Sequence, residues 1–294
     1  QDGQWLYGLE VFKNDGPWLV PENYQKLNGV LSYSDGTRLN GYSVTGMLYK
    51  SSWISTDQVP LRAINQGLIG RFGSLDPTTG GETHRYSVSS QWAQTGKDRQ
   101  TKANFWALDS ALDLWSNFEY CTGSIEKTGN CAAGDQFKQA EKRKAFGFGL
   151  SEARYHQLSL LNSKYESAFT FGVDGRSDHI FPVGLYKTTR RAVTETVRED
   201  AVTQSSVSLW AQNEIRWTST IRSIVGARAD AYQFDVKSNL AANSGKASDQ
   251  KVSPKLSLIF GPLGTTEFYA NYGAGFHSND ARGTTISVDG GISI

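Results

Sequence analysis

The feature that most constrains this chain is an alternation of apolar with small or polar residues, repeated in stretches of about ten residues from end to end. The connections between these stretches alternate as well, very short and then long. This rhythm is typical of transmembrane β-strands, whose side chains point in turn to lipid and to the barrel interior. Short turns on one membrane face and long loops on the other explain the second alternation. The sequence therefore predicts an all-β, antiparallel, up-and-down transmembrane β-barrel.

The composition fits a barrel with an apolar exterior and a hydrated interior. The chain has 8 Trp, 13 Tyr, 14 Phe and 30 Gly, yet only 38% of its residues are hydrophobic. No run approaches the roughly 18 to 20 apolar residues of a membrane helix. A net charge of +1 gives no support for nucleic-acid binding. A large soluble β-protein is the alternative that composition leaves open.

The alternation predicts about eleven strands. They cover about 5–14, 26–34, 40–53, 84–94, 101–117, 139–155 and 165–176, then a strand ending at Trp217, one around 225–231, and finally 252–260 and 267–276. The long segments, expected outside, lie near 15–25, 54–83, 118–138, 177–192, 237–250 and from 277 onward. Bacterial single-chain barrels have even strand numbers, and an open sheet edge is unfavourable in lipid. We therefore expect residues 1–294 to be a segment of a larger barrel.

Charged residues on the predicted inward faces indicate a hydrated wall. In the strand 101–117, Trp106, Leu108, Leu112 and Leu114 are predicted to face lipid, opposite Asp109 and Asp113. The predicted lumen-lining residues are Asp109, Asp113, Asp174, Glu214, Arg216, Arg228 and Asp230. They form either a solvated wall or a selectivity-lining surface. Their mixed signs disfavour a simple ion-selective porin.

The two cysteines, Cys121 and Cys131, lie in one polar, Gly-containing segment. Their proximity favours a loop disulfide in an oxidising compartment, with two free thiols as the alternative. A metal site would usually need four ligands, and the rest of this segment offers no His or further Cys.

Several segments in order carry a family resemblance. They are Asn14-Asp15-Gly16-Pro17-Trp18, the run Phe72-Gly73-Ser74-Leu75-Asp76-Pro77, the run Val225-Gly226-Ala227-Arg228-Ala229-Asp230, and the block from Ser253 to Thr285 with its Gly-Ala-Gly-Phe and Asn-Asp-Ala-Arg sequences. In this pattern the chain resembles the TonB-dependent outer-membrane receptors over nearly its whole length.

The resemblance implies a Gram-negative outer-membrane receptor whose barrel has about 22 strands around an N-terminal plug. Such receptors import ferric siderophores or similar bulky nutrients with energy supplied through TonB. The chain resembles the barrel only, without plug, TonB box or C-terminal strands. Its expected partners are outer-membrane lipid and an extracellular ligand such as a ferric siderophore, with the TonB complex reached only through the missing plug.

Arginine and aromatic side chains near the predicted loops are candidates for binding an anionic chelate, because guanidinium pairs with carboxylate or phosphate and aromatic rings supply stacking area. These candidates are Trp18, Tyr24, Arg62, Arg71, His84, Arg85, Tyr186, Arg190, Arg191, His277, Asn279 and Arg282. Solvated loop surface and an interfacial aromatic girdle are the alternative. Arg282 and Asn279 are favoured because their motif resembles the family's.

Catalysis is not predicted. The histidines are scattered, and His277, Ser278 and Asp280 are sequence neighbours on an extended segment, which does not make a triad. No cofactor and no metal site are expected. Two other functions are left open: a passive porin or surface-binding barrel, and a soluble β-sandwich binding module in which Trp106 and Leu112 would be packed in a core.

Overall fold

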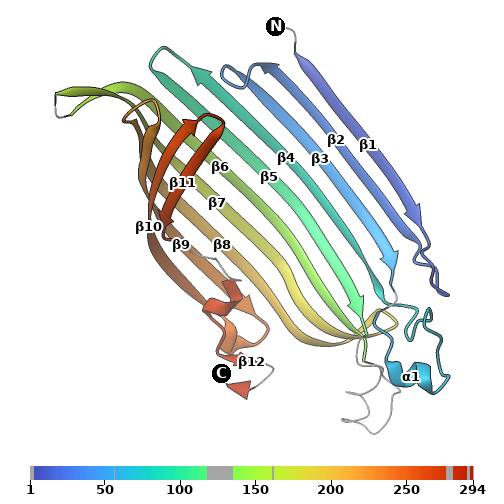
Figure 1. Ribbon diagram of the computed structural model, residues 1–294. Coiled ribbons are helices and arrows are strands. Elements are labelled where there is room, and N and C mark those ends of the chain that lie inside the picture. The colour runs from blue at the N-terminus through green and yellow to red at the C-terminus, as the bar shows by residue number, and fades with distance from the viewer. Residues whose placement is uncertain are drawn as a thin grey trace.

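The computed structural model describes residues 3–55, 57–117, 135–160, 162–275, 281–289 and 292–293. An 11-stranded antiparallel sheet runs in the order β1 to β11, so that each strand pairs with its neighbours in sequence (Figure 1). The elements are β1 (Gln4–Asn14), β2 (Tyr24–Gly36), β3 (Gly41–Ile54), α1 (Leu61–Asn65), β4 (Gly80–Thr95), β5 (Arg99–Ser116), β6 (Phe137–Leu160), β7 (Ser163–Thr189), β8 (Ala192–Arg216), β9 (Ile221–Ser238), η1 (Ala241–Asn243), β10 (Gly245–Leu263), β11 (Thr266–Gly273), η2 (Ala281–Thr284), β12 (Val288–Asp289) and β13 (Ile292–Ser293). Nowhere in this described part does a helix have the length and apolarity to cross a membrane.

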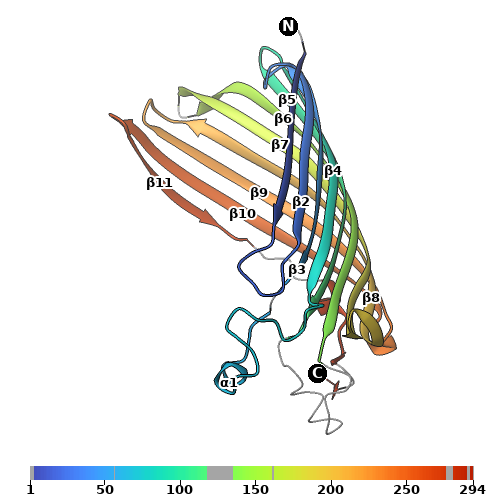
Figure 2. The same cartoon turned by 90° about the vertical axis from the view of Figure 1, so that its right-hand side faces the viewer.

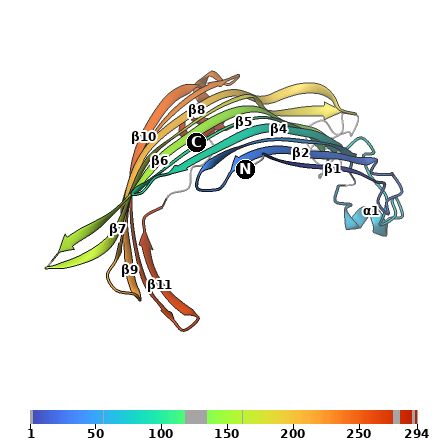
Figure 3. The same ribbon diagram turned by 90° about the horizontal axis from the view of Figure 1, so that it is seen from above.

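The sheet is a single curved layer. Seen from above, the strands follow an arc with a concave face (Figure 3), and the side view shows them tilted relative to one another (Figure 2). The connection that contains α1 lies at the end opposite the short turns. A β-sandwich requires a second sheet packed against the first. The all-β, up-and-down prediction is therefore confirmed, and the sandwich alternative is wrong.

Burial alternates from one residue to the next and distinguishes the two faces. Along β6, Ala145, Gly147 and Gly149 are buried, whereas Phe146 and Phe148 between them are exposed. Curvature crowds side chains on the concave face and spreads them on the convex one. We call the crowded face, which holds Ser208 and Asp230, the inner face, and the other the outer face.

The outer face carries an apolar band that crosses the sheet. Its exposed members include Trp5, Tyr7, Leu9, Leu31, Tyr42, Val44, Leu48, Tyr86, Val88, Trp92, Phe105, Phe146, Phe148, Leu150, Phe169, Phe171, Val207, Leu209, Val225, Leu256, Leu258 and Phe260. Near the short turns the Trp5 and Tyr33 rings lie 4.9 Å apart. Exposed apolar area on this scale marks an interaction surface, and an aromatic edge is typical of membrane barrels.

Three strands are much longer than a bilayer crossing requires. β6, β7 and β8 have 24, 27 and 25 residues, whereas a membrane strand needs about 9–11. The predicted loop 177–192 is therefore wrong: it is strand, closed by a turn at Arg190 and Arg191, both with positive φ. The segment 237–250 is likewise mostly strand with η1 between β9 and β10. Polar composition beyond the apolar band made these extensions resemble loops.

The facing predicted for β5 is also wrong. Asn104 pairs with Gly149, and Gly149 with Asp174, so the even-numbered residues of β5 share the inner face with Asp174. Trp106, Leu108, Leu112 and Leu114 thus lie on the inner face, and Asp109 and Asp113 on the outer one. Both faces of β5 carry apolar residues, so the strand's own alternation was ambiguous and only its neighbours decide.

The indole of Trp106 has room on the inner face because its cross-strand neighbour on β6 is Gly147. A Cβ at Gly147 on β6 would meet the Trp106 ring at 2.6 Å. The guanidinium of Arg176, on β7, lies 5.5 Å from the centre of the same ring. The indole can therefore lie flat against the sheet.

Gly147→Val is expected to lower the free energy of unfolding by about 1–3 kcal/mol, because the new side chain overlaps the indole. Chemical denaturation of the full-length protein in lipid vesicles, followed by tryptophan fluorescence, measures this loss. The matched control is Gly46→Val on β3, where a Cβ meets only the Leu31 oxygen at 3.9 Å. Equal stability of the two variants would contradict the packing described here.

Candidate functional site

Three Arg-x-Asp pairs occupy the inner face of adjacent strands, at Arg176/Asp178 on β7, Arg198/Asp200 on β8 and Arg228/Asp230 on β9. A spacing of two places both side chains of a pair on one face. The Arg Nε to Asp oxygen distances are 2.7, 2.7 and 2.8 Å respectively. The motif thus repeats as one geometry across three strands.

In each pair the carboxylate is buried and the guanidinium is more exposed. The aspartate side chains are 0–1% exposed, whereas those of Arg176 and Arg228 are 50% and 41% exposed. Each carboxylate holds its arginine in one orientation through a charge-assisted hydrogen bond. On the inner face, fixed guanidinium groups are therefore accessible from the concave side of the sheet, and their aspartate counter-ions are buried beneath them.

Further contacts join the pairs into networks. Arg228 Nη1 reaches Asp174 at 2.7 Å, and the Ser208 hydroxyl donates to Asp230 at 2.6 Å. Arg143 Nη1 lies 3.1 Å from Asp178. A cation with several anchors loses little freedom on binding an anion.

A cleft of about 450 Å³ opens on this inner face. It is lined by the Arg143, Arg176 and Asp178 network and by two aromatic side chains, Tyr232 and Phe234, whose rings stack 6.2 Å apart at an interplanar angle of 3°. Ile180, Val183 and Ala281 also line the cleft and belong to a small apolar cluster with Val202 and Val236. Guanidinium beside aromatic surface suits a ligand that is both anionic and planar.

The chain after β11 returns to this inner face. Arg282 Nη1 lies 3.7 Å from Asp200, and the Ser287 backbone N–H donates to Asn243 Oδ1 at 2.9 Å. The structure thus places Arg282 beside the Arg198/Asp200 pair. Its predicted companions His277 and Asn279 lie outside the described residues, as do Cys121 and Cys131.

Several predicted ligand residues instead make internal contacts at the long-loop end. The Trp18 indole donates to Glu22 at 2.6 Å, and the Tyr186 hydroxyl donates to Glu199 at 2.7 Å. The Tyr24 ring packs against Phe12. Arg191 Nε donates to the Thr78 carbonyl, and its guanidinium lies 4.6 Å from the Trp115 ring. These side chains hold loops and strands together.

The remaining predicted residues lie at several separate places on the sheet and its connections. Arg71 lies in the long connection between β3 and β4, Arg190 in the β7–β8 turn, and Arg85 on the inner face of β4, all exposed. Arg62 belongs to α1. His84 lies on the outer face, 3.1 Å from Asp109. Glu214 and Arg216 share the inner face with Arg228 near the short turns.

Asp76 fixes the connection between β3 and β4. Its carboxylate accepts from the Thr78 N–H at 2.9 Å, from Asn117 Nδ2 at 3.1 Å and from Gln136 Nε2 at 2.8 Å. Burial alone raises the pKa of Asp76, but these hydrogen bonds together hold it below its ordinary value. The charged form therefore ties this connection to β5 and β6.

Asp76→Asn is expected to open this connection, since an amide nitrogen would face donors, at a cost of about 1–3 kcal/mol. Hydrogen-exchange protection at Thr78 and Thr79 measures the change, with the exposed Asp249→Asn as control. Because the pKa is lowered on folding, the stabilisation is present above the ordinary value of 3.8 and is lost as the pH falls through the folded value. A wild-type protein that kept full protection at low pH would contradict this role.

Two comparisons identify similar proteins. The family model described as "TonB dependent receptor-like, beta-barrel" matches residues 12–291. The fold resembles the ferric citrate transporter FecA (TM-score 0.68, 10% identity, 92% of this chain and 39% of that one). It also resembles the ferric-catecholate import receptor Fiu from E. coli K12 (0.63, 8%, 92% and 49%) and the copper transporter OprC (0.58, 12%, 92% and 40%).

This chain spans less than half the length of these three structures. At such low identities the likeness establishes the fold alone. A comparison of the sequence with curated proteins gives no significant match.

Proposed function

Because this chain belongs to the TonB-dependent receptor-like β-barrel family, we propose that it forms barrel wall in an outer-membrane receptor that takes up an anionic metal chelate such as a ferric siderophore. The observation that carries the proposal is the set of three Arg-x-Asp pairs beside an aromatic-lined cleft. In the proposed barrel the outer apolar band contacts lipid, and the inner face lines the path of the ligand.

The chemistry of the inner face favours an anionic chelate. Fixed guanidinium groups recognise carboxylate and catecholate oxygens by charge-assisted hydrogen bonds. The ring faces of Tyr232 and Trp106 add stacking area for a planar ligand. The names of FecA and Fiu refer to ferric chelates, which supports this class, whereas OprC is named for copper.

Capture begins at the long-loop end, where Arg71 and Arg190 are exposed, and Arg85 is exposed further along on the inner face of β4. An anionic chelate then passes to the cleft around Arg176, where the Arg-x-Asp pairs hold it without large rearrangement. Release toward the periplasm is the step that requires a rearrangement of the plug, driven by energy supplied through TonB. The proposed role is transport, and it requires no catalytic group.

Arg176→Ala is expected to weaken chelate binding about tenfold, roughly 1.4 kcal/mol, because a charge-assisted contact in the cleft is lost. Equilibrium binding of ferric citrate and of a ferric tris-catecholate to the full-length protein measures this. Arg154→Ala is the control, since Arg154 pairs with Glu152 on the outer face and is 65% exposed. If both variants bound both chelates as the wild type does, the cleft would not be the ligand path.

The passive porin is the less favoured function. The inner wall of a porin would need no preference among anionic solutes, and the family match does not point to a porin. Liposome swelling with neutral sugars separates the two, because a porin admits them freely and a closed receptor does not.

A further inference from the structure

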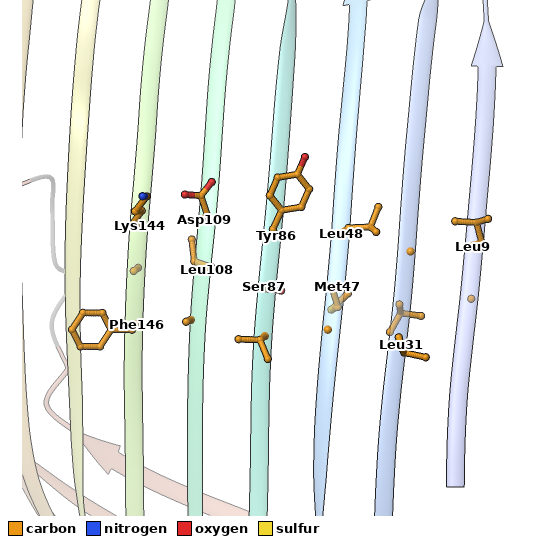
Figure 4. A pocket seen from close by; sticks show the side chains of 17 residues that line it. Leu9, Leu31, Met47, Leu48, Tyr86, Ser87, Leu108, Asp109, Lys144 and Phe146 are labelled. Atoms are coloured by element: carbon orange, nitrogen blue, oxygen red, sulfur yellow. The ribbon is translucent and has the colours of Figure 1, made fainter.

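The apolar band on the outer face ends abruptly at a belt of lysine and histidine. Successive outward positions change from Leu48 to Lys50 on β3, from Tyr86 to His84 on β4, and from Phe146 to Lys144 on β6. Figure 4 shows this change: Leu9, Leu31 and Phe146 lie along an apolar groove, and Asp109 and Lys144 lie side by side at its margin. The change occurs on the side of the band toward the long loops.

Strand register aligns the belt in two rows. One row contains Asp109, Lys144, His179, Thr203 and Asp235, each paired with the next across β5 to β9. The other row pairs Lys50, His84, Ala111 and Lys142, and Lys237 extends it beyond Ala201. We call the outward Lys50, His84, Lys142, Lys144, His179 and Lys237 the basic belt.

Two aspartates, Asp109 and Asp235, lie within the two rows of the belt. Asp109 contacts His84 at 3.1 Å, and Asp235 contacts Lys246 at 3.5 Å. Within the part of the chain that the structure describes, Lys142, Lys144 and Lys237 form no ion pair, and all three are exposed. The two rows hold four lysines and two aspartates, so the belt carries a net positive charge.

Two adjoining grooves match the two parts of a lipid. The apolar groove, of about 920 Å³, includes Leu48, Val88 and Phe146. A second groove of about 550 Å³ is lined by Lys142, Lys144, His179, Phe181 and Lys237. Asp109 and Lys144 line both grooves, so the two are continuous. Phe181, 60% exposed beside the lysines, offers further surface to acyl chains.

We propose that the basic belt binds the phosphate headgroup of a lipid in the leaflet on the long-loop side, with its acyl chains in the apolar groove. The inference rests on the membrane orientation of the proposed function. A phosphate complements the three unpaired lysines, and polybasic clusters at a membrane surface attract anionic headgroups. The long-loop side is the outward side of the barrel.

The test compares lipid retention by the full-length protein in native mass spectrometry. The probes are a bisphosphorylated glucosamine lipid (lipid A) and phosphatidylcholine, each added to detergent-solubilised protein. The variant is Lys142→Gln/Lys144→Gln. Its control, Lys97→Gln/Lys164→Gln, removes the same charge from exposed positions at the short-turn end.

We expect the wild type and the control to retain the phosphorylated lipid, and the belt variant to bind it about ten- to thirtyfold more weakly. Excess inorganic phosphate should leave the lipid bound, because free phosphate lacks acyl chains. Equal retention by all three proteins, equal binding of phosphatidylcholine, or full displacement by inorganic phosphate would each overturn the proposal. Chelate binding by the same variants separates this result from the proposed function, since the belt lies on the face opposite the cleft.

Discussion

Leu209→Arg is expected to lower the free energy of unfolding in bilayers by about 2–4 kcal/mol. Leu209 lies on the outer face of β8, 64% exposed, between the apolar side chains of Val173 and Ala229 on the neighbouring strands. A guanidinium at this position would enter the hydrocarbon unless the bilayer thinned around it. Reversible folding of the full-length protein into lipid vesicles, titrated with denaturant, gives the loss directly.

Leu112→Arg is the matched control because it makes the same substitution on the opposite face. Leu112 pairs with Thr83 and Glu141 on the inner face of β5. An arginine there can reach water and the Glu141 carboxylate, so we expect a change of about 1 kcal/mol or less. A larger loss for Leu112→Arg than for Leu209→Arg would show that the two faces are assigned the wrong way round.

This pair of variants also marks where sequence reasoning succeeded and where it failed. The alternation in β8 is clearer, because Val207, Leu209 and Ile215 oppose Ser208, Gln212 and Glu214, although Trp210 shares the polar face. In β5 the outward residues include Ala107 and Ala111, whose small side chains do not mark a face, while large apolar residues lie inward. Period-two geometry separates two faces, but only pairing with β4 and β6 tells which is which.

Strand lengths were underestimated for a related reason. The apolar band covers only part of β7 and β8, and beyond it the outward residues include Ser177, His179 and Thr203 on strands that continue to pair. A polar segment with Pro182 has the composition of a loop. Backbone hydrogen bonds to a long neighbouring strand, which no single segment reveals, keep it extended.

The candidate site was only partly foreseeable. Arg228 and Asp230 were predicted on the inner wall, but the repetition of Arg-x-Asp at Arg176 and Arg198 went unused although the sequence contains it. A search for this spacing on one face of consecutive strands would have found all three pairs. The aromatic lining of the cleft depends on register between β7, β8 and β9, because Arg176, Ser206 and Tyr232 meet only through pairing.

Arg228→Ala is expected to lower the free energy of unfolding by about 1.5–3 kcal/mol. The substitution removes the contacts to Asp174 and Asp230 at 2.7 and 2.8 Å and leaves the Asp230 carboxylate, 1% exposed, with the Ser208 hydroxyl. A buried charge without its counter-ion is costly. We expect less than the cost of breaking a fully buried pair because Arg228 is itself 41% exposed and partly screened by water.

Adding Asp230→Asn to Arg228→Ala should restore part of the loss, since the double variant no longer buries an unpaired charge. The control is Arg154→Ala, which breaks a 2.7 Å pair of the same spacing on the outer face, where Arg154 is 65% exposed. It should cost about 1 kcal/mol or less. The two arginines differ chiefly in the burial of their partners, since Glu152 is 21% exposed and Asp230 only 1%. If Arg228→Ala and Arg154→Ala cost the same, the buried aspartates would not be what holds the guanidinium groups in place on the inner face.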